Sequence, residues 1–268
     1  MLVATFALDP RPGEYAGNLE QALQAVEQAA ARGAVLLALP ELWPTSFLPA
    51  GHAGALEATV EAVEKVAARA GELGVVVVGS ALADSGQSKP FNRAHVLEGG
   101  EVVAFHDKVH LFSPTAEPAA FTAGVEPPPV VDTGAGRLGA MVCYDVRFPE
   151  LSRVVFRGGA ELLVVVAQWP GVRAPHWRSL CMGRAVEGQM FVLGANRRGD
   201  VPFGRTGRKL EYVGNGLIVS PDGELLGEST AAEPLLVVDI DLEDVHRQRK
   251  VLPIAKDERP GLYDSWPR

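Results

Sequence analysis

The sequence predicts an α/β fold in which residues 1–268 form a single domain, with two mixed β-sheets packed between helices as a four-layer αββα sandwich. Buried apolar strands alternate with amphipathic helices, a pattern typical of parallel strands joined by helical connections. Glycine-containing turns also join neighbouring strands as hairpins, which requires antiparallel pairs in the same sheets. No proline- and serine-rich linker and no repeat of fixed period divides the sequence.

The first half of the sequence contains the clearest alternation. Asn18 is expected to cap the first helix and Gly33 to end it. The pair Gly99-Gly100 accepts positive φ and predicts a hairpin. In chain order, the expected elements are the strand Leu2–Leu8, the helix Asn18–Arg32, the strand Val35–Leu39, the helix Leu56–Leu73, the strand Val75–Ser80 and the hairpin strands Asn92–Leu97 and Glu101–His106.

The second half repeats this organisation. Gly134–Gly139 fits G-x-G-x-x-G, but a strand follows it where a dinucleotide-binding loop would open a helix, so we interpret it as a hairpin turn. The stretch Arg197–Leu210, including the short basic segment Arg205–Lys209, is interpreted as a surface loop. The expected elements are the strands Val130–Asp132 and Arg137–Cys143, the helix Pro149–Arg157, the strand Glu161–Ala167, the helix Ala174–Gln189, the strand Phe191–Ala195, the hairpin strands Gly216–Ser220 and Glu224–Glu228, and the strand Leu235–Ile240.

Composition argues against several function classes. The formal net charge is −8 and no run of Lys and Arg is long enough for a basic patch, so no nucleic-acid partner is expected. The longest apolar runs are far shorter than a membrane span. Two cysteines in 268 residues favour free thiols, and the N-terminus lacks the basic region of a signal peptide, so a cytoplasmic location is expected. His106 and His110 lack the glutamate of a zinc-protease motif, and neither a metal nor a cofactor is expected.

Cys143 stands at a strand-to-helix turn, where a nucleophile is exposed at the edge of a sheet. It follows the apolar strand Leu138–Val142 and precedes a helix opened by Pro149. The backbone N–H groups after such a residue point at the reacting carbonyl. A buried structural thiol explains the same position equally well, so this segment alone leaves both interpretations open.

Two charged residues also follow strands. Glu41 comes directly after Val35–Leu39 and Pro40, where a carboxylate is partly desolvated and suits a general base. Lys108 follows Glu101–His106, and a lysine beside a reacting carbonyl stabilises a developing oxyanion. Taken alone, each residue is more often an ordinary surface or capping residue. Together with Cys143 they make a candidate catalytic set.

The segments around these three residues resemble the nitrilase superfamily of carbon–nitrogen hydrolases. The Glu–Lys–Cys triad of that superfamily matches Glu41, Lys108 and Cys143 in order and in local context. The segment Cys-Tyr-Asp-Val-Arg-Phe-Pro-Glu, which starts at Cys143, is the most specific match. Further matches, which extend the resemblance over nearly the whole chain, are Gln168-Trp169-Pro170, Pro175-His176-Trp177, Arg184-Ala185-Val186-Glu187 and Asn196-Arg197.

The resemblance implies covalent catalysis of amide hydrolysis without a cofactor. Glu41 would take the thiol proton of Cys143, and the sulfur would attack the amide carbonyl. Lys108 and the backbone N–H of Tyr144 would hold the oxyanion. The resemblance also implies a second glutamate downstream of the lysine, which Glu117 matches and which would position Lys108 or the attacking water. The alternative for Glu117 is a surface loop residue.

The resemblance further implies the nitrilase-like αββα sandwich and a homodimer, or a higher homo-oligomer, in which two sandwiches face each other. The C-terminal segment, at about residues 243–268, contains arginine, proline and aromatic residues. We expect this segment to pack on a neighbouring subunit.

The stretch Trp169–Trp177 resembles the ω-amidase branch, whose substrates are ω-amides of dicarboxylates such as 2-oxoglutaramate and 2-oxosuccinamate. The far carboxylate of such a substrate calls for an arginine, and Arg173 is the candidate, with a solvated loop arginine as the equal alternative. Trp169 and Phe47 are further substrate-binding candidates. The sequence departs from the branch at Gly216, where a serine is usual.

Three alternatives stay open at this point. The chain can belong to another branch of the superfamily, such as a deaminated-glutathione amidase, an N-carbamoyl amidohydrolase or a nitrilase. It can also be a non-catalytic binding module on the same fold. A papain-like Cys–His hydrolase would instead make His106, His110 or His176 essential.

Overall fold

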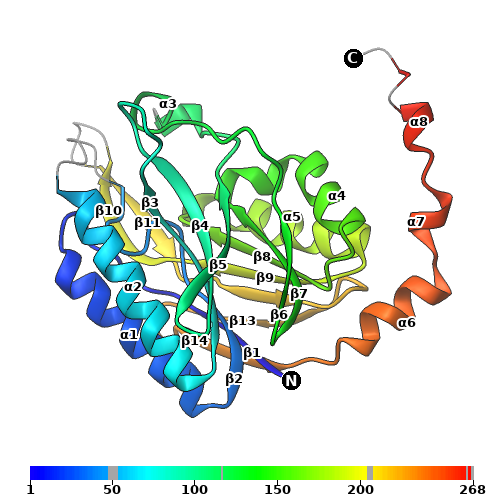
Figure 1. The fold of residues 1–268 in the computed structure, drawn as a ribbon, viewed down its shortest axis with the longest axis horizontal. Coiled ribbons are helices and arrows are strands. Elements are labelled where there is room, and N and C mark those ends of the chain that lie inside the picture. Colours follow the sequence, from blue (N-terminus) through cyan, green and yellow to red (C-terminus); the bar gives the residue numbers. More distant parts are fainter. Residues whose placement is uncertain (48–53, 116, 204–207, 264, 267–268) are drawn as a thin grey trace.

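Two six-stranded sheets face each other between helices in the computed structural model of the chain, which describes residues 1–47, 54–115, 117–203, 208–263 and 265–266 (Figure 1). The predicted fold class, α/β with two mixed sheets in a sandwich, is confirmed. The strands of the first sheet are β14 (Leu235–Asp239), β1 (Leu2–Phe6), β2 (Ala34–Ala38), β3 (Val76–Ala83), β4 (Phe91–Glu98) and β5 (Glu101–Asp107), in that spatial order. The strands of the second are β13 (Leu225–Glu228), β12 (Leu217–Val219), β9 (Phe191–Asn196), β8 (Leu162–Ala167), β7 (Gly136–Val142) and β6 (Val130–Thr133).

Both sheets have parallel strands at the centre and antiparallel strands at the edges. In the first sheet, β1, β2 and β3 are parallel, and β4, β5 and β14 are added antiparallel. In the second, β7, β8 and β9 are parallel, and β6, β12 and β13 are antiparallel. The predicted hairpin at Gly99-Gly100 joins β4 to β5, with φ of 61° and 93° at the two glycines.

The helices cover the outer faces of the sandwich. Alternation along β2 shows the arrangement, because Leu36 and Ala38 pack toward the second sheet whereas Leu37 and Leu39 pack on the first two helices. The helices are α1 (Tyr15–Ala31) and α2 (Ala55–Leu73) over the first sheet, α4 (Pro149–Arg157) and α5 (Ala174–Gly188) over the second, the short α3 (Glu117–Ala120), and α6 (Glu243–Val251), α7 (Ile254–Asp257) and α8 (Pro260–Tyr263) near the C-terminus.

The expected cap of the first helix is wrong. Helix α1 begins at Tyr15, so Asn18 lies inside it and is buried. Its side-chain oxygen accepts the N–H of Arg11, and its amide nitrogen donates to the carbonyls of Arg11 and Pro44. Asn18 therefore fastens two loops to the helix rather than starting it.

The surface loop expected between Arg197 and Leu210 is also wrong for the residues described. β10 (Arg198–Phe203) and β11 (Arg208–Val213) pair as an antiparallel hairpin of their own. Most of the basic segment interpreted as a loop, at residues 205–207, lies outside the described residues. The charged residues of this stretch favoured a loop, although Val201, Leu210 and Tyr212 alternate with them on one face of the hairpin.

The C-terminal helices leave the sandwich along one side (Figure 1). Val245 of α6 is fully buried, and Gln189 donates to the carbonyls of Gln248 and Leu252. Glu258 forms ion pairs with Arg153 and Arg157 of α4. The segment therefore contacts its own chain as far as Glu258. None of the described helices combines the length and the apolarity that crossing a bilayer requires.

Candidate active site

The polar residues of the candidate site gather at one edge of the two sheets. β2, β7 and β8 are followed by Glu41, Cys143 and Gln168, at the carboxyl ends of parallel strands. β5 is antiparallel to β4, which is antiparallel to β3, so β5 ends at the same edge and places Lys108 there. Ligands of open α/β sheets bind at this edge.

The turn after β2 presents Glu41 to the interior. Its backbone N–H lies 3.4 Å from the Ala167 carbonyl at the end of β8. Ser80 of β3 fixes the following residues, because its hydroxyl accepts the Leu42 N–H at 2.8 Å and its carbonyl accepts the Trp43 N–H at 3.0 Å. Gly79 is needed beside it, since a Cβ there would stand 2.8 Å from the Trp43 ring.

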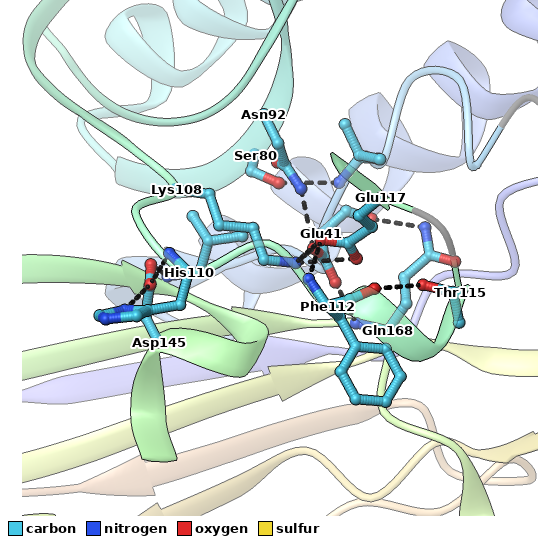
Figure 2. Close-up of polar contacts among 12 residues, drawn as sticks. Glu41, Ser80, Asn92, Lys108, His110, Phe112, Thr115, Glu117, Asp145 and Gln168 are labelled. Carbon is cyan, nitrogen blue, oxygen red and sulfur yellow. Dashed lines mark hydrogen bonds and ion pairs between the residues drawn. The ribbon is translucent and has the colours of Figure 1, made fainter. Parts of the chain in front are cut away.

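The Glu41 carboxylate accepts hydrogen bonds from three donors and is fully buried. Its Oε1 accepts from Lys108 Nζ and from Asn92 Nδ2, both at 2.8 Å, and its Oε2 accepts the Gln168 N–H at 2.9 Å (Figure 2). Three donors on one carboxylate hold it in a single orientation and compensate its desolvation.

Lys108 lies between two carboxylates. Its Nζ is 2.8 Å from Glu41 Oε1 and 2.8 Å from Glu117 Oε2, and its side chain is fully buried (Figure 2). Burial opposes its positive charge, but the charges of Glu41 and Glu117 outweigh burial and hold the pKa of Lys108 above its ordinary value. The site thus contains a fixed cation. Gly124 allows the neighbouring backbone to approach, because its N–H donates to the Lys108 carbonyl and a Cβ would stand 2.3 Å from the Asp107 carbonyl oxygen.

Glu117 begins α3 and is buried, with 4% of its surface exposed. Besides Lys108 it accepts the Phe112 N–H at 2.8 Å. Burial raises the pKa of Glu117, and the Lys108 ammonium partly offsets that rise. The structure therefore brings Glu117 to the site and not to a surface loop.

Cys143 opens the 3₁₀ turn Cys143–Arg147 with a φ of 48°, a left-handed conformation that is strained for any residue but glycine. The thiol is buried close to the Glu41 carboxylate. Burial and the negative charge of Glu41 raise the pKa of Cys143 well above its ordinary value, although Lys108 opposes the rise. The sulfur is therefore a protonated thiol at neutral pH with a carboxylate in place to receive its proton. The next residue, Tyr144, lies in the same turn.

The three substrate-binding candidates differ in position. Arg173 is exposed, and its guanidinium carbon lies 5.6 Å from the centre of the ring of Phe112, whose backbone N–H donates to Glu117. Trp169 is buried and donates from its indole nitrogen to the Arg173 carbonyl at 2.9 Å. Phe47 is half-buried and packs edge-on against Phe121, with 6.1 Å between ring centres.

Two donors to Glu41 were missed from the sequence. Asn92 and Gln168 are single polar residues at strand ends, and only the three-dimensional pairing of β4 and β8 with their neighbours brings them to the carboxylate. Behind them, the fully buried side chain of Arg197 donates to Gln168 Oε1 and Ser46 Oγ at 2.9 Å each, and forms an ion pair with Asp9. The available signal for these residues was a polar side chain at a position where the strand pattern expects an apolar one.

The remaining cysteine and histidines have other partners. Cys181 is fully buried in α5, and burial raises the pKa of its thiol. His106 and His110 both contact Asp145, and His176 faces Arg147. Because the partner of the Cys143 thiol is Glu41, this geometry disfavours the papain-like alternative. In the part of the chain that the structure describes, no three His, Cys, Asp or Glu side chains could hold a metal together.

Comparison with known proteins identifies the family of this chain. A sequence model of the family described as carbon–nitrogen hydrolase matches residues 2–250. The chain belongs to the carbon–nitrogen hydrolase family. Among the relatives of this carbon–nitrogen hydrolase, the 2-oxoglutaramate amidase of Bacillus subtilis (strain 168) is 30% identical over 97% of this chain and 98% of its own length. The chloroplastic omega-amidase of Arabidopsis thaliana is 30% identical over 92% of this chain and 69% of its own length.

Solved structures of an amidase from Nesterenkonia sp. AN1 share the fold of this carbon–nitrogen hydrolase. One, described as an amidase from the nitrilase superfamily, superposes with a TM-score of 0.81 at 32% identity, covering 96% of this chain and 97% of that one. Another, with a TM-score of 0.85 and 31% identity over 100% of this chain and 97% of that one, carries the acetamide moiety of fluoroacetamide on its active site cysteine. The predicted resemblance to the nitrilase superfamily and the predicted enzyme class are confirmed.

Proposed function

We propose that this carbon–nitrogen hydrolase cleaves the ω-amide of a small dicarboxylate to a carboxylate and ammonia, with Cys143 as nucleophile. The observation that carries the proposal is the buried cluster in which Cys143, Glu41, Lys108 and Glu117 meet at the edge of both sheets. A base beside a thiol and a fixed cation beside the base are the groups that acyl transfer through sulfur requires.

Acylation begins with proton transfer. Glu41 takes the thiol proton, and the Cys143 sulfur attacks the amide carbonyl to form a tetrahedral intermediate. Lys108 Nζ and the backbone N–H of Tyr144 stabilise the negative charge that develops on the carbonyl oxygen, and one such donor is worth roughly a hundredfold in rate or more. Tyr144 follows Cys143 directly in the same turn, which begins with a left-handed φ of 48° at Cys143.

The second half of the cycle returns the proton. Protonated Glu41 donates to the departing nitrogen as the carbon–nitrogen bond breaks, and ammonia leaves a thioester on Cys143. Water then attacks the thioester carbonyl while Glu41 accepts a proton from it. The sulfur leaves and recovers that proton, so the acid product and the free enzyme are restored. Glu117 keeps Lys108 in place during both steps through their 2.8 Å ion pair.

The dicarboxylate preference rests on Arg173 and on the relatives that are named for 2-oxoglutaramate and omega-amides. Arg173 is an exposed cation beside Phe112, whose N–H is bound by Glu117. A carboxylate at the far end of the substrate would pair with this guanidinium while the amide lies at Cys143. Trp169 and Phe47 would flank the substrate. The alternative is another activity of the same superfamily on a neutral amide, a carbamoyl compound or a nitrile.

An ammonia-release assay tests the activity. We expect 2-oxoglutaramate and 2-oxosuccinamate to be hydrolysed faster than butyramide, an N-carbamoyl amino acid or a nitrile. The Cys143→Ala variant should lose all turnover, and the matched Cys181→Ala variant should keep it, because Cys181 is buried in α5 away from the acid and lysine. Amide turnover by Cys143→Ala would contradict the mechanism, and rapid nitrile hydrolysis without ω-amide hydrolysis would contradict the substrate class.

A second variant tests the carboxylate clamp. Arg173→Ala should raise KM for 2-oxoglutaramate about tenfold or more, because a charge-assisted pair is lost, and should leave KM for butyramide unchanged. Arg178→Ala is the matched control, since Arg178 is an exposed arginine on α5 that pairs with Glu228 instead. Equal effects of Arg173→Ala on both substrates would remove Arg173 from substrate recognition.

The active form is a cytoplasmic homodimer whose C-terminal segment extends over the second subunit. Two free, buried cysteines fit a reducing compartment. The apolar side chains of Val154, Val186, Leu262 and Trp266 are exposed on α4, α5 and the segment after Glu258, as expected for surfaces that a second copy covers. Light scattering should give a dimer for the full chain, and deletion of residues 259–268 should weaken dimerisation; an unchanged dimer would exclude this role of the segment.

A further inference from the structure

A third buried carboxylate lies beside the site and has no part in the mechanism above. Asp145, two residues after Cys143, is fully buried. Its Oδ1 accepts the His110 N–H at 2.9 Å and faces His110 Nδ1 at 3.0 Å (Figure 2). Its Oδ2 lies 3.4 Å from both His106 Nε2 and the Val142 N–H.

These partners surround the lysine in the sequence. His106 and His110 stand two residues before and two residues after Lys108, so one carboxylate holds both sides of the segment that carries the cation. Ring stacking adds to the contact between this segment and the turn that begins with Cys143. The His110 ring stacks on Phe148 with 3.5 Å between centres and an interplanar angle of 7°. Residues 106–112 are thus docked on the turn that begins with Cys143.

The same carboxylate supports the strained turn. Cys143 has a φ of 48°, and a non-glycine residue keeps a left-handed conformation only where the surrounding contacts demand it. Asp145 closes the turn back onto Val142 and onto the neighbouring segment at once. Burial opposes its charge, but hydrogen bonds from His106 and His110 hold the pKa of Asp145 below its usual range, so the group stays ionised.

We propose that Asp145 is a positioning residue for amide hydrolysis, which sets Lys108 against the nucleophile Cys143 by binding His106 and His110 on either side of the lysine. The inference rests on the proposed function, since it assigns Asp145 a task within that mechanism. Misplacement of catalytic groups by about 1 Å costs roughly a hundredfold in rate. Loss of this carboxylate should therefore lower turnover and leave substrate binding intact.

Asp145→Asn tests the proposal, because the amide has the same shape but only one acceptor oxygen for donors on two sides. We expect kcat to fall about 100-fold with KM within about threefold, at a temperature where circular dichroism shows the variant fully folded. The matched control is Asp132→Asn, which removes an exposed aspartate from β6 and should change neither constant. A folded Asp145→Asn variant whose kcat stays within twofold of the parent would overturn the proposal.

His110→Ala keeps the proposal testable if Asp145→Asn does not fold. The imidazole is partly exposed, and its removal leaves the backbone N–H bond to Asp145 in place. We expect a smaller loss of kcat, about tenfold, with KM unchanged; a rise in KM alone, or no change, would overturn the proposal.

A substrate-independent readout separates the two proposals. The rate of Cys143 alkylation by iodoacetamide, followed by intact mass, should fall about tenfold in Asp145→Asn because the thiol and Glu41 no longer stay aligned. If the parent enzyme hydrolyses no amide, the proposed function fails while this rate still reports on Asp145. An unchanged alkylation rate in the folded variant would count against positioning whatever the substrate.

Discussion

Replacing Glu117 by glutamine should affect the two reactivities of Cys143 in opposite directions. Glu117 Oε2 accepts from both the Lys108 ammonium and the Phe112 N–H at 2.8 Å each, and Oε1 accepts from Lys108 again at 3.0 Å. Glutamine offers one oxygen and one amino group, so in either orientation its amino group faces a donor. One hydrogen bond is lost, and the site also loses a negative charge.

The magnitude follows from the bond that is lost. A hydrogen bond that involves a charged group contributes about 1.5–3 kcal/mol. If that contribution is realised when Lys108 stabilises the oxyanion, kcat for an amide falls roughly tenfold to 150-fold. The thiol responds differently. The charge of Glu117 is one of the causes that raise the pKa of Cys143, so its removal lowers the thiol pKa and moves alkylation by iodoacetamide to lower pH.

Both measurements use the same preparation of Glu117→Gln. Ammonia release gives kcat and KM, and the pH dependence of the alkylation rate gives the direction of the thiol shift. Glu126→Gln is the matched control, because it makes the same substitution at an exposed position nine residues away. The reasoning is refuted if kcat stays within twofold of the parent, or if the alkylation profile moves to higher pH.

Three further predictions concern stability. Burial lowers the pKa of His95 from 6.5 to about 4. The contribution of the neutral imidazole to the free energy of unfolding is therefore complete above pH 6.5 and is lost as pH falls toward 4. Urea unfolding should show about 2 kcal/mol less stability at pH 5 than at pH 7, and His95→Gln should abolish that difference. Arg197→Met removes the buried guanidinium that donates to Gln168, Ser46 and Asp9 and should cost about 3 kcal/mol, a fall in Tm of roughly 6–12 °C by calorimetry. Gly194→Ala places a Cβ 2.6 Å from the Trp177 ring and should lower the free energy of unfolding by about 1–3 kcal/mol in urea titration, whereas an unchanged free energy would show that the ring can move.

Most of the fold could be predicted from the sequence because its elements carry local signals. The helix Pro149–Arg157 was predicted to the residue, since proline opens it and glycine follows it. The hairpin β10–β11 was missed, because the charged residues that alternate with Val201, Leu210 and Tyr212 favoured a surface loop. The prediction that Asn18 caps the first helix was wrong because an asparagine near an expected helix start is typical of a cap. Its side chain instead bonds Arg11 and the distant Pro44.

The candidate site divides in the same way. Glu41, Lys108 and Cys143 could be proposed because each directly follows a strand and because the segments around them resemble a known family. Asn92 and Gln168 could not be assigned, since a single polar residue at a strand end has no pattern of its own. Their partner, Glu41, lies 51 and 127 residues away in the sequence.

Charge balance at the site depends on residues that a sequence motif does not mark. Lys108 lies between the carboxyl groups of Glu41 and Glu117, and Glu41 also accepts the Gln168 N–H. A rigid carboxylate is useful as a base only if its orientation survives protonation. Asn92 and the Gln168 N–H are neutral donors, so they stay bound to Glu41 whether or not it carries a proton, whereas the pull of Lys108 weakens when it does. In the proposed mechanism, the neutral donors therefore keep Glu41 aimed at Cys143 through both halves of the catalytic cycle, a task that Lys108 does not perform alone.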